Sequence, residues 1–391
     1  MLYNKLVSTN ILFLTLFLFF INFCEAQLLT LASKDSLNNK PKKEFYITAW
    51  LKLNGIMDYQ GISNTSAMNL TLIPTDGSNP DPHFTMDMYQ TRIKLASTFQ
   101  TLKLGEIFSF IETDFYGGNG GGLRMRHAYI RFLNFRIGQT WSGFTDEEAW
   151  PNITDFDGPS TGAWVRQTQF TYFIRPSKSE DILIAFETPM QDFNRYIELD
   201  TTITSGNPSL PDFTTHYEKR WGKNHFQVAA VARVFKYKNE ANRVNYEPGY
   251  GFNISGKNIL YKRDNIVWQA IWGKGISRYL VSFGGGGWDA LPDTQGNLVA
   301  LPVYGGYFGY QHFWGSTAMS STFVYGYAAV DNPFDLPNDH LFTGSYVSGN
   351  IYWQPIGPLN FALEFIYGNR RDEFGNYGDN IRGQFVFEYN F

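Results

Sequence analysis

Along most of the chain, apolar and polar residues alternate with a period of two, the pattern of a β-strand that has one apolar and one polar face. The last eleven residues, "IRGQFVFEYNF", place Phe385 and Phe387 on one face and Arg382, Gln384 and Glu388 on the other. Helical periodicity is scarce past the first 27 residues. The pattern therefore predicts an all-β protein.

Sixteen such segments recur, and the connections between them alternate in length. Turns of one to five residues alternate with long or polar loops, so the long loops all fall at one end of the predicted strands. This sorting is typical of a transmembrane antiparallel β-barrel with long extracellular loops. A closed barrel pairs every backbone N–H and C=O inside lipid without an open edge. The predicted strands are 44–58, 86–99, 103–115, 122–133, 135–142, 162–175, 180–188, 213–221, 225–236, 247–257, 263–274, 300–312, 315–328, 342–354, 358–370 and 380–391.

The composition agrees with a barrel. Aromatic residues make up 18% of the 391 residues, yet mean hydropathy is only −0.28. Outward side chains facing outer-membrane lipid and inward ones facing water would give both values. Trp and Tyr at strand ends suit the two membrane interfaces. The net charge of −4 offers no basic excess that would favour nucleic acid.

The first 26 residues have the features of a signal peptide. Lys5 precedes an apolar run at 11–22, and Ala26 is a small residue suited to cleavage. We expect a short periplasmic segment at 27–43 and the barrel at 44–391. Removal of the peptide would remove Cys24, the single cysteine, which excludes disulfides and cysteine-bound metals. We expect no cofactor and no metal.

The candidate chemistry lies between residues 92 and 175. Alternation turns most of the basic side chains there toward the lumen, whereas Arg131 and Arg166 share a face with outward residues and are predicted at the rim. The predicted pore wall consists of Arg92, Lys94, Arg124, Arg126, Arg136 and Arg175.

The third long loop is strongly acidic. A barrel of about sixteen strands is too wide to select solutes, so we expect this loop to fold inward as a constriction. Acids opposite arginines would create a transverse field, and the planar guanidinium suits a carboxylate. The arginines could equally serve only to anchor the loop through salt bridges. The loop carries Asp146, Glu147, Glu148, Asp155 and Asp157.

The stretches "FRIGQTWSGFTD", "DFDGP" and "VRQTQFTY" between Arg131 and Tyr172 resemble the DcaP-like outer-membrane porins. The resemblance implies a homotrimer of sixteen-stranded barrels that passes small negatively charged solutes such as dicarboxylates. It also implies that a terminal strand ending in Phe387, Tyr389 and Phe391 is recognised by the outer-membrane assembly machinery. Many members of the family carry a helical coiled coil before the barrel, and heptads are absent between Gln27 and Lys43.

We therefore expect an outer-membrane diffusion porin, not an enzyme, that prefers small anions. A sugar-specific channel is the main alternative, because Phe108, Phe110, Phe173 and Phe235 could form an aromatic slide in the lumen. A membrane-embedded hydrolase and a soluble carbohydrate-binding β-protein are weaker alternatives. The six histidines are scattered, and the H-E-x-x-H motif of zinc hydrolases does not occur.

Overall fold

The computed structural model describes residues 29–34, 41–60, 62, 66–78, 80–118, 120–193, 203–293, 295–315, 318–331 and 341–391. The predicted signal peptide lies outside the described residues, as do residues 27–28 and 35–40 of the predicted segment 27–43. No helix among the described residues is both long and apolar enough to cross a membrane.

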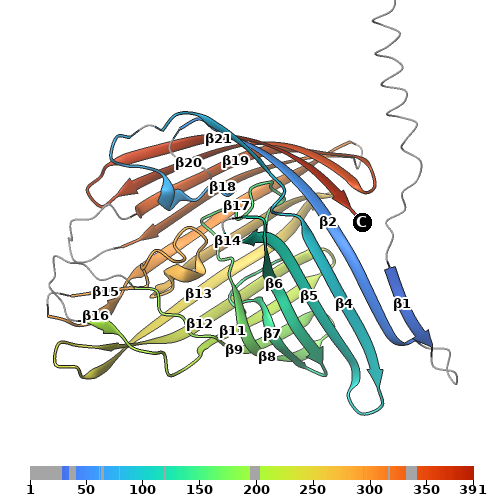
Figure 1. Cartoon of the computed structure of the whole chain (residues 1–391), viewed down its shortest axis with the longest axis horizontal. Helices are drawn as coiled ribbons and strands as arrows, with labels where there is room; N and C mark the ends of the chain where they lie inside the picture. The colour runs from blue at the N-terminus through green and yellow to red at the C-terminus, as the bar shows by residue number, and fades with distance from the viewer. Residues whose placement is uncertain are drawn as a thin grey trace, which may run out of the picture.

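The described part of the chain forms one closed antiparallel barrel of sixteen strands (Figure 1). Closure comes from β2, which pairs with β4 on one side and with the last strand on the other, where Leu53 lies opposite Phe387. The barrel strands are β2 (Pro41–Asp58), β4 (Arg92–Thr101), β5 (Gly105–Gly117), β6 (Gly122–Phe132), β7 (Phe135–Trp141), β8 (Arg166–Ser177), β9 (Glu180–Glu187), β11 (Asp212–Trp221), β12 (Asn224–Lys238), β13 (Val244–Tyr261), β14 (Asp264–Lys274), β17 (Pro302–Trp314), β18 (Met319–Val330), β19 (Leu341–Ile356), β20 (Leu359–Asp372) and β21 (Tyr377–Asn390).

Each of these strands overlaps one predicted segment, so the fold prediction is confirmed. One segment differs in detail. The predicted strand 86–99 is divided into β3 (His83–Asp87) and β4, and both parts pair with β2. Smaller pieces accompany the barrel: β1 (Leu29–Lys34), η1 (Leu70–Leu72), β10 (Thr204–Ser205), η3 (Ser277–Tyr279), β15 (Ala290–Pro292) and β16 (Leu298–Ala300).

Strand β1 extends the sheet at the short-turn end of the barrel. It pairs antiparallel with residues 41–47 of β2, below the point where Asn390 of β21 pairs with Trp50. In Figure 1 this strand lies beside the protruding end of β2. β1 thereby covers an edge of β2 that β21 is too short to reach.

Alternation along the strands separates two environments, as the sequence pattern predicts. In β21, Phe385 and Phe387 are exposed on the outer surface, whereas Gln384 and Val386 are buried inside the barrel. Arg382 is also fully buried and does not face open water. Its guanidinium donates two hydrogen bonds to Asp58 of β2, at 2.8 and 2.9 Å, across the seam that closes the barrel.

The buried core lies inside the barrel, where three loops pack against the wall. The sequence predicted one inward loop, the third (142–165, called L3), and two more accompany it. The described part of the first loop (59–82, L1) contributes Met68 and Leu70 to a cluster on the inner face of β17–β20. The sixth (275–301, L6) contributes a second cluster. The arrangement leaves open lumen on the side of β4–β9.

The inward fold of L6 depends on a buried ion pair that the hydrophobic pattern does not reveal. Arg233 of β12 donates to Asp289 of L6 at 2.7 Å and to the Gly275 carbonyl at 2.9 Å. Asp289 also accepts from Ser277 at 2.9 Å. A buried charge of this kind requires a partner of opposite sign, so Arg233 and Asp289 stabilise each other in the lumen.

Candidate functional site: the constricted pore

L3 begins where its backbone is held by a buried carboxylate. Ser142 Oγ and the Gly143 amide both donate to Glu187 Oε1, each at 2.8 Å. Farther along, the loop crosses the lumen and reaches β20, where Glu364 accepts hydrogen bonds from the Thr154 amide and hydroxyl and from the Asp155 amide. L3 is therefore fixed at both sides of the barrel.

The "GQ" of the family-like stretch shapes the wall opposite L3. Gly138 has φ of 133°, and an added Cβ would lie 2.2 Å from the Ala128 carbonyl oxygen, so only glycine fits there. The Gln139 side chain donates to the carbonyls of Met125 at 3.0 Å and Arg126 at 3.2 Å. Those carbonyls flank a β-bulge in β6, and Gln139 satisfies them where the ladder is interrupted.

Three connected cavities follow the wall from the long-loop end to the short-turn end. The upper cavity, of about 350 Å³, lies between Arg124 and L6. The middle cavity, of about 460 Å³, separates L3 from β2 and β4–β6. The lower cavity, of about 370 Å³, opens between the start of L3 and β8–β12. Trp164 lines the upper two and Trp141 the lower two, so the cavities form one path.

The predicted pore-wall cations all line this path. Arg124 lines the upper cavity; Arg92, Lys94 and Arg126 line the middle one; Arg136 and Arg175 line the lower one. Among the described residues, all of them except Arg136 form ion pairs with wall carboxylates that sequence reasoning missed, and Arg175 pairs with Asp181 at 3.1 Å. Arg126 contacts Glu112 at 2.7 Å and Asp114 at 3.0 Å, and Arg124 binds Asp114 through two nitrogens.

Glu112 also forms ion pairs with the remaining cations of the middle cavity. Its oxygens lie 3.6 Å from Arg92 and 3.5 Å from Lys94. None of these four cations forms an ion pair with L3 among the described residues, which runs against the expectation that the arginines only anchor the loop. Glu112 lies in β5, where aromatic side chains flank it, and alternation alone did not mark it as a lumen residue.

Three arginines on the path have no carboxylate partner within ion-pair distance in the described part of the chain. Each guanidinium stacks on an aromatic ring: Arg131 on Phe108 at 5.1 Å, Arg136 on Phe173 at 5.1 Å and Arg166 on Trp141 at 4.5 Å. Stacking fixes the plane of the guanidinium and leaves its N–H edge free.

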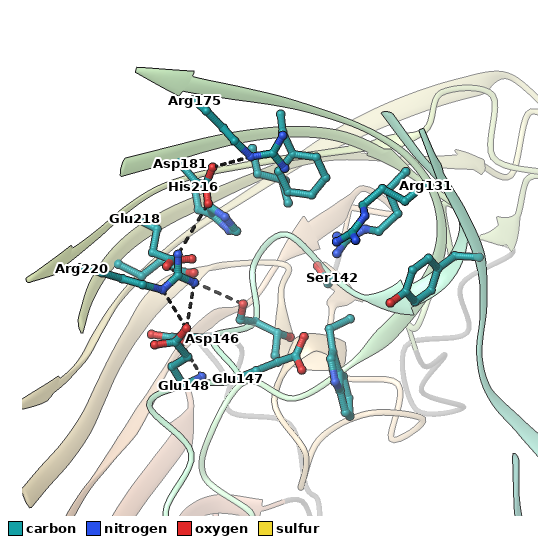
Figure 2. A pocket seen from close by; sticks show the side chains of 17 residues that line it. Arg131, Ser142, Asp146, Glu147, Glu148, Arg175, Asp181, His216, Glu218 and Arg220 are labelled. Atoms are coloured by element: carbon teal, nitrogen blue, oxygen red, sulfur yellow. Dashed lines mark hydrogen bonds and ion pairs between the residues drawn. The ribbon is translucent and has the colours of Figure 1, made fainter. Parts of the chain in front are cut away.

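Arg131 lies near the short-turn end of β6, close to its predicted place, but its side chain lines the lumen, so its assignment to the outward face is wrong. Because of the bulge in β6, Glu112 lies opposite His127 and Thr113 lies opposite Met125. Residues after the bulge therefore face the other way from simple alternation, and Arg131 lines the lower cavity (Figure 2). Arg166 stands at the upper mouth, close to its predicted place.

The acids of L3 lie in different surroundings. Asp146 is buried and accepts from His225 Nε2 and Ser255, while Glu148 contacts Arg220 of the wall. Glu147 borders both the middle and lower cavities without an ion pair among the described residues. It is exposed to the lumen but enclosed by protein, and this desolvation raises its pKa to about 7.

The far end of L3 carries two more acids. Asp155 is buried against L1, where the Met68 amide and Tyr346 hydroxyl donate to it, and desolvation raises its pKa. Asp157 lines the upper cavity, and desolvation raises its pKa to about 6, although Arg166 opposes the shift.

The proposed aromatic slide is not assembled along the path. Phe235 is fully buried beneath L6. Phe108 and Phe110 stack on one another with ring centroids 6.3 Å apart, and Phe173 lies beneath Arg136 and Arg175. A different aromatic group stands at the middle cavity: the Trp164 ring lies 4.0 Å from both Trp141 and Trp150.

The terminal strand closes the barrel as the sequence predicts. β21 pairs with β2, and the Phe391 amide donates to the Ala49 carbonyl at 2.9 Å. Phe387 and Phe391 are exposed on the outer surface, and the Tyr389 ring packs edge-on against Phe391.

A closed sixteen-strand barrel, narrowed by an inward loop that faces a charged wall, defines a porin of the bacterial outer membrane. Residues 30–391 match the profile of the DcaP outer membrane protein family, and the chain belongs to that family. No curated protein sequence matches the chain.

Solved structures share the fold at low sequence identity. The outer membrane channel DcaP of Acinetobacter baumannii is similar at a TM-score of 0.77 and 18% identity, over 92% of this chain and 99% of that one. An anion-selective porin from Comamonas acidovorans is similar at a TM-score of 0.60 and 8% identity, over 89% of this chain and 100% of that one. OprB of Pseudomonas putida is similar at a TM-score of 0.53 and 8% identity, over 89% and 94%.

Proposed function

We propose that this porin prefers small anions, with dicarboxylates as the best-matched class. The observation that carries the proposal is the set of arginines Arg131, Arg136 and Arg166, which line the path without a carboxylate partner among the described residues. A stacked guanidinium with a free edge can hold a carboxylate through two hydrogen bonds. Arg131 and Arg136 lie opposite each other on neighbouring strands, so the two carboxylates of one small solute could engage both.

The acids of L3 that would repel anions lose their negative charge near neutral pH. Glu147, with a pKa of about 7, is about half neutral at pH 7, and Asp157 follows at about 6. The guanidinium groups keep their charge throughout this range. The solved relative from Comamonas acidovorans is described as anion-selective, which favours the same reading.

A sugar channel has one observation in its favour, the tryptophan group at the middle cavity. Sugars stack on free aromatic faces, however, and these faces are taken. Trp164 packs against Trp141 and Trp150 at 4.0 Å, and Arg166 covers Trp141 at 4.5 Å. The anion-preferring porin remains the better-supported function.

Reversal potentials in a potassium chloride gradient, measured on the purified protein in planar bilayers, test the proposal. We expect the unmodified channel to favour chloride. Replacing two unpaired cations, Arg136→Gln with Arg166→Gln, should lower the anion-to-cation permeability ratio severalfold. Lys103→Gln is the matched control, because Lys103 is exposed in the β4–β5 turn outside the lumen.

Cation preference in the unmodified channel, or a ratio that the double variant leaves unchanged, would overturn the anion proposal. Liposome swelling, which measures how fast a solute enters through the channel, provides a second test. If a neutral disaccharide enters faster than a smaller dicarboxylate, the sugar channel is the better reading.

We also propose the remaining features that the sequence indicates or that the family resemblance implies. These are export by a signal peptide at 1–26, a short periplasmic segment at 27–43, a homotrimer in the outer membrane, and recognition of the strand ending at Phe391 by the assembly machinery. The exposed aromatic face of β21, with Phe385, Phe387 and Phe391, supports the last of these.

A further inference from the structure

A cluster at the short-turn end of the pore is not explained by solute passage. Glu148 of L3, Glu218 of β11 and His225 of β12 bring one donor atom each to within 4.8 Å of one another. Glu148 and Glu218 line the lower cavity near the start of L3 (Figure 2). The two strands meet at a short turn, so the wall donors are held by the barrel itself.

The decisive atom is Nδ1 of His225. Only 2% of this residue is exposed, and Nδ1 has no hydrogen-bond partner among the described residues. It points between Glu218 Oε1 at 3.4 Å and Glu148 Oε2 at 3.5 Å. Both distances exceed the usual 2.7–3.2 Å of an N–H···O hydrogen bond.

The same distances suit two ligands of one ion. Zinc binds imidazole nitrogen and carboxylate oxygen at about 2.0–2.2 Å in a tetrahedron, whose ligand atoms are then about 3.4 Å apart. The opposite nitrogen supports this reading. His225 Nε2 lies 2.8 Å from Asp146 Oδ2, and Ser255 donates to the same oxygen at 2.6 Å. A carboxylate on the far nitrogen of a metal-binding histidine fixes its tautomer and strengthens it as a ligand.

Among the described residues, Arg220 is the arginine or lysine that forms ion pairs with the cluster. It donates to Glu148 Oε1 at 2.8 Å, contacts Glu218, and lies 3.5 Å from Asp181. Its side chain is two-fifths exposed, so it can release Glu218 Oε1 and keep Asp181. Glu148 Oε1 would stay with Arg220 while Oε2 turned to the ion, because the two oxygens of one carboxylate can serve different partners.

We propose that Glu148, Glu218 and His225 form a binding site for Zn²⁺ or a similar borderline transition-metal ion, with water as the fourth ligand. Two ligands belong to the wall and one to L3, so the bound ion would clip the constriction loop to the barrel. Imidazole together with carboxylate favours such ions over Mg²⁺, which prefers an all-oxygen octahedron. The site does not depend on the proposed anion preference.

Calorimetric titration of the folded full chain in detergent, after treatment with a chelator, tests the site with zinc chloride as the probe. We expect one ion per chain. Glu148→Gln should weaken binding at least tenfold, and it should fold normally because Glu148 is exposed on a loop. Glu218→Gln should act similarly. Glu180→Gln is the matched control, since this acid at the same end of the barrel bonds to Tyr217 and Lys219 outside the cluster.

The absence of saturable zinc binding would overturn the proposal, as would binding that survives both Glu148→Gln and Glu218→Gln. Equal affinity for Mg²⁺ would exclude an imidazole-ligated site. If Glu218→Gln fails to fold, the result for Glu148→Gln decides alone.

Discussion

At the scale of single residues, the carboxylates of the lumen differ in whether they form ion pairs. Glu112 and Asp114 pair with Arg92, Lys94, Arg124 and Arg126, whereas Glu147 stands in the lumen without an ion pair among the described residues. Desolvation disfavours its charged form more strongly than the attraction of Arg136 favours it, so the pKa is raised. Glu147 is therefore the acid of L3 whose charge responds most directly to pH near neutrality.

The pH dependence of selectivity follows from Glu147. A carboxylic acid is neutral below its pKa, so lowering the pH from 8 to 6 removes a negative charge beside the pore, with a midpoint near 7. The anion-to-cation permeability ratio should rise through this range, and Asp157 should add to the rise near pH 6. Reversal potentials at a series of pH values measure it.

Glu147→Gln should flatten the step near pH 7, whereas Glu148→Gln, whose carboxylate is held by Arg220, should retain it. A ratio that does not change between pH 8 and 6 in the unmodified chain would contradict the assignment.

At the scale of elements, period-two alternation predicted the strands but misjudged positions next to a bulge. Arg131 was assigned to the outward face because nothing in a single sequence shows that β6 changes phase between Arg126 and His127. The inward folds of L1 and L6 escaped prediction for a related reason. They depend on contacts distant in the sequence, such as Arg233 with Asp289, and leave no periodic signal. L3 was predictable because its acids suggested a charged partner surface.

The anchoring of L3 at β20 can be tested at one position. Glu364→Met removes the acceptor of the Thr154 and Asp155 amides while keeping the side chain about the same length. Unsatisfied buried donors cost about 1–3 kcal/mol, so the far end of L3 should detach more often. Single-channel recordings should show more frequent current steps. Glu106→Gln, on the exposed β4–β5 hairpin, is the control and should not change the frequency of current steps. A trace as steady as that of the unmodified channel would show that Glu364 does not hold the loop.

At the scale of the whole molecule, the seam between β2 and β21 decides whether a barrel exists. The buried Arg382–Asp58 pair lies toward the long-loop end of the seam, and the Phe391 amide to Ala49 carbonyl hydrogen bond lies at its short-turn end. This pairing was readable from the sequence, since both strands alternate and the barrel must close. The contribution of β1 was not, because only the end-on placement of β1 and β21 along β2 reveals the edge that β1 covers.

Removal of Phe391 separates assembly from conduction. Phe391 lies outside the lumen, so pores that do form should conduct as before. The yield of folded protein in outer-membrane fractions should fall severalfold, because the exposed terminal aromatic is lost together with one hydrogen bond of the seam. Heat-modifiable migration on gels measures the folded fraction. A normal yield of folded protein together with altered conductance would show that Phe391 acts in conduction and not in assembly.

The hydrogen bonds between Thr154 and Glu364 span 210 residues of chain. Contacts so far apart in sequence form late, because the intervening chain must first be ordered. The far end of L3 thus lacks the Glu364 acceptor until β20, one of the last strands to be synthesised, is in place. The anchoring of the constriction loop is therefore completed only as the final strands join the barrel.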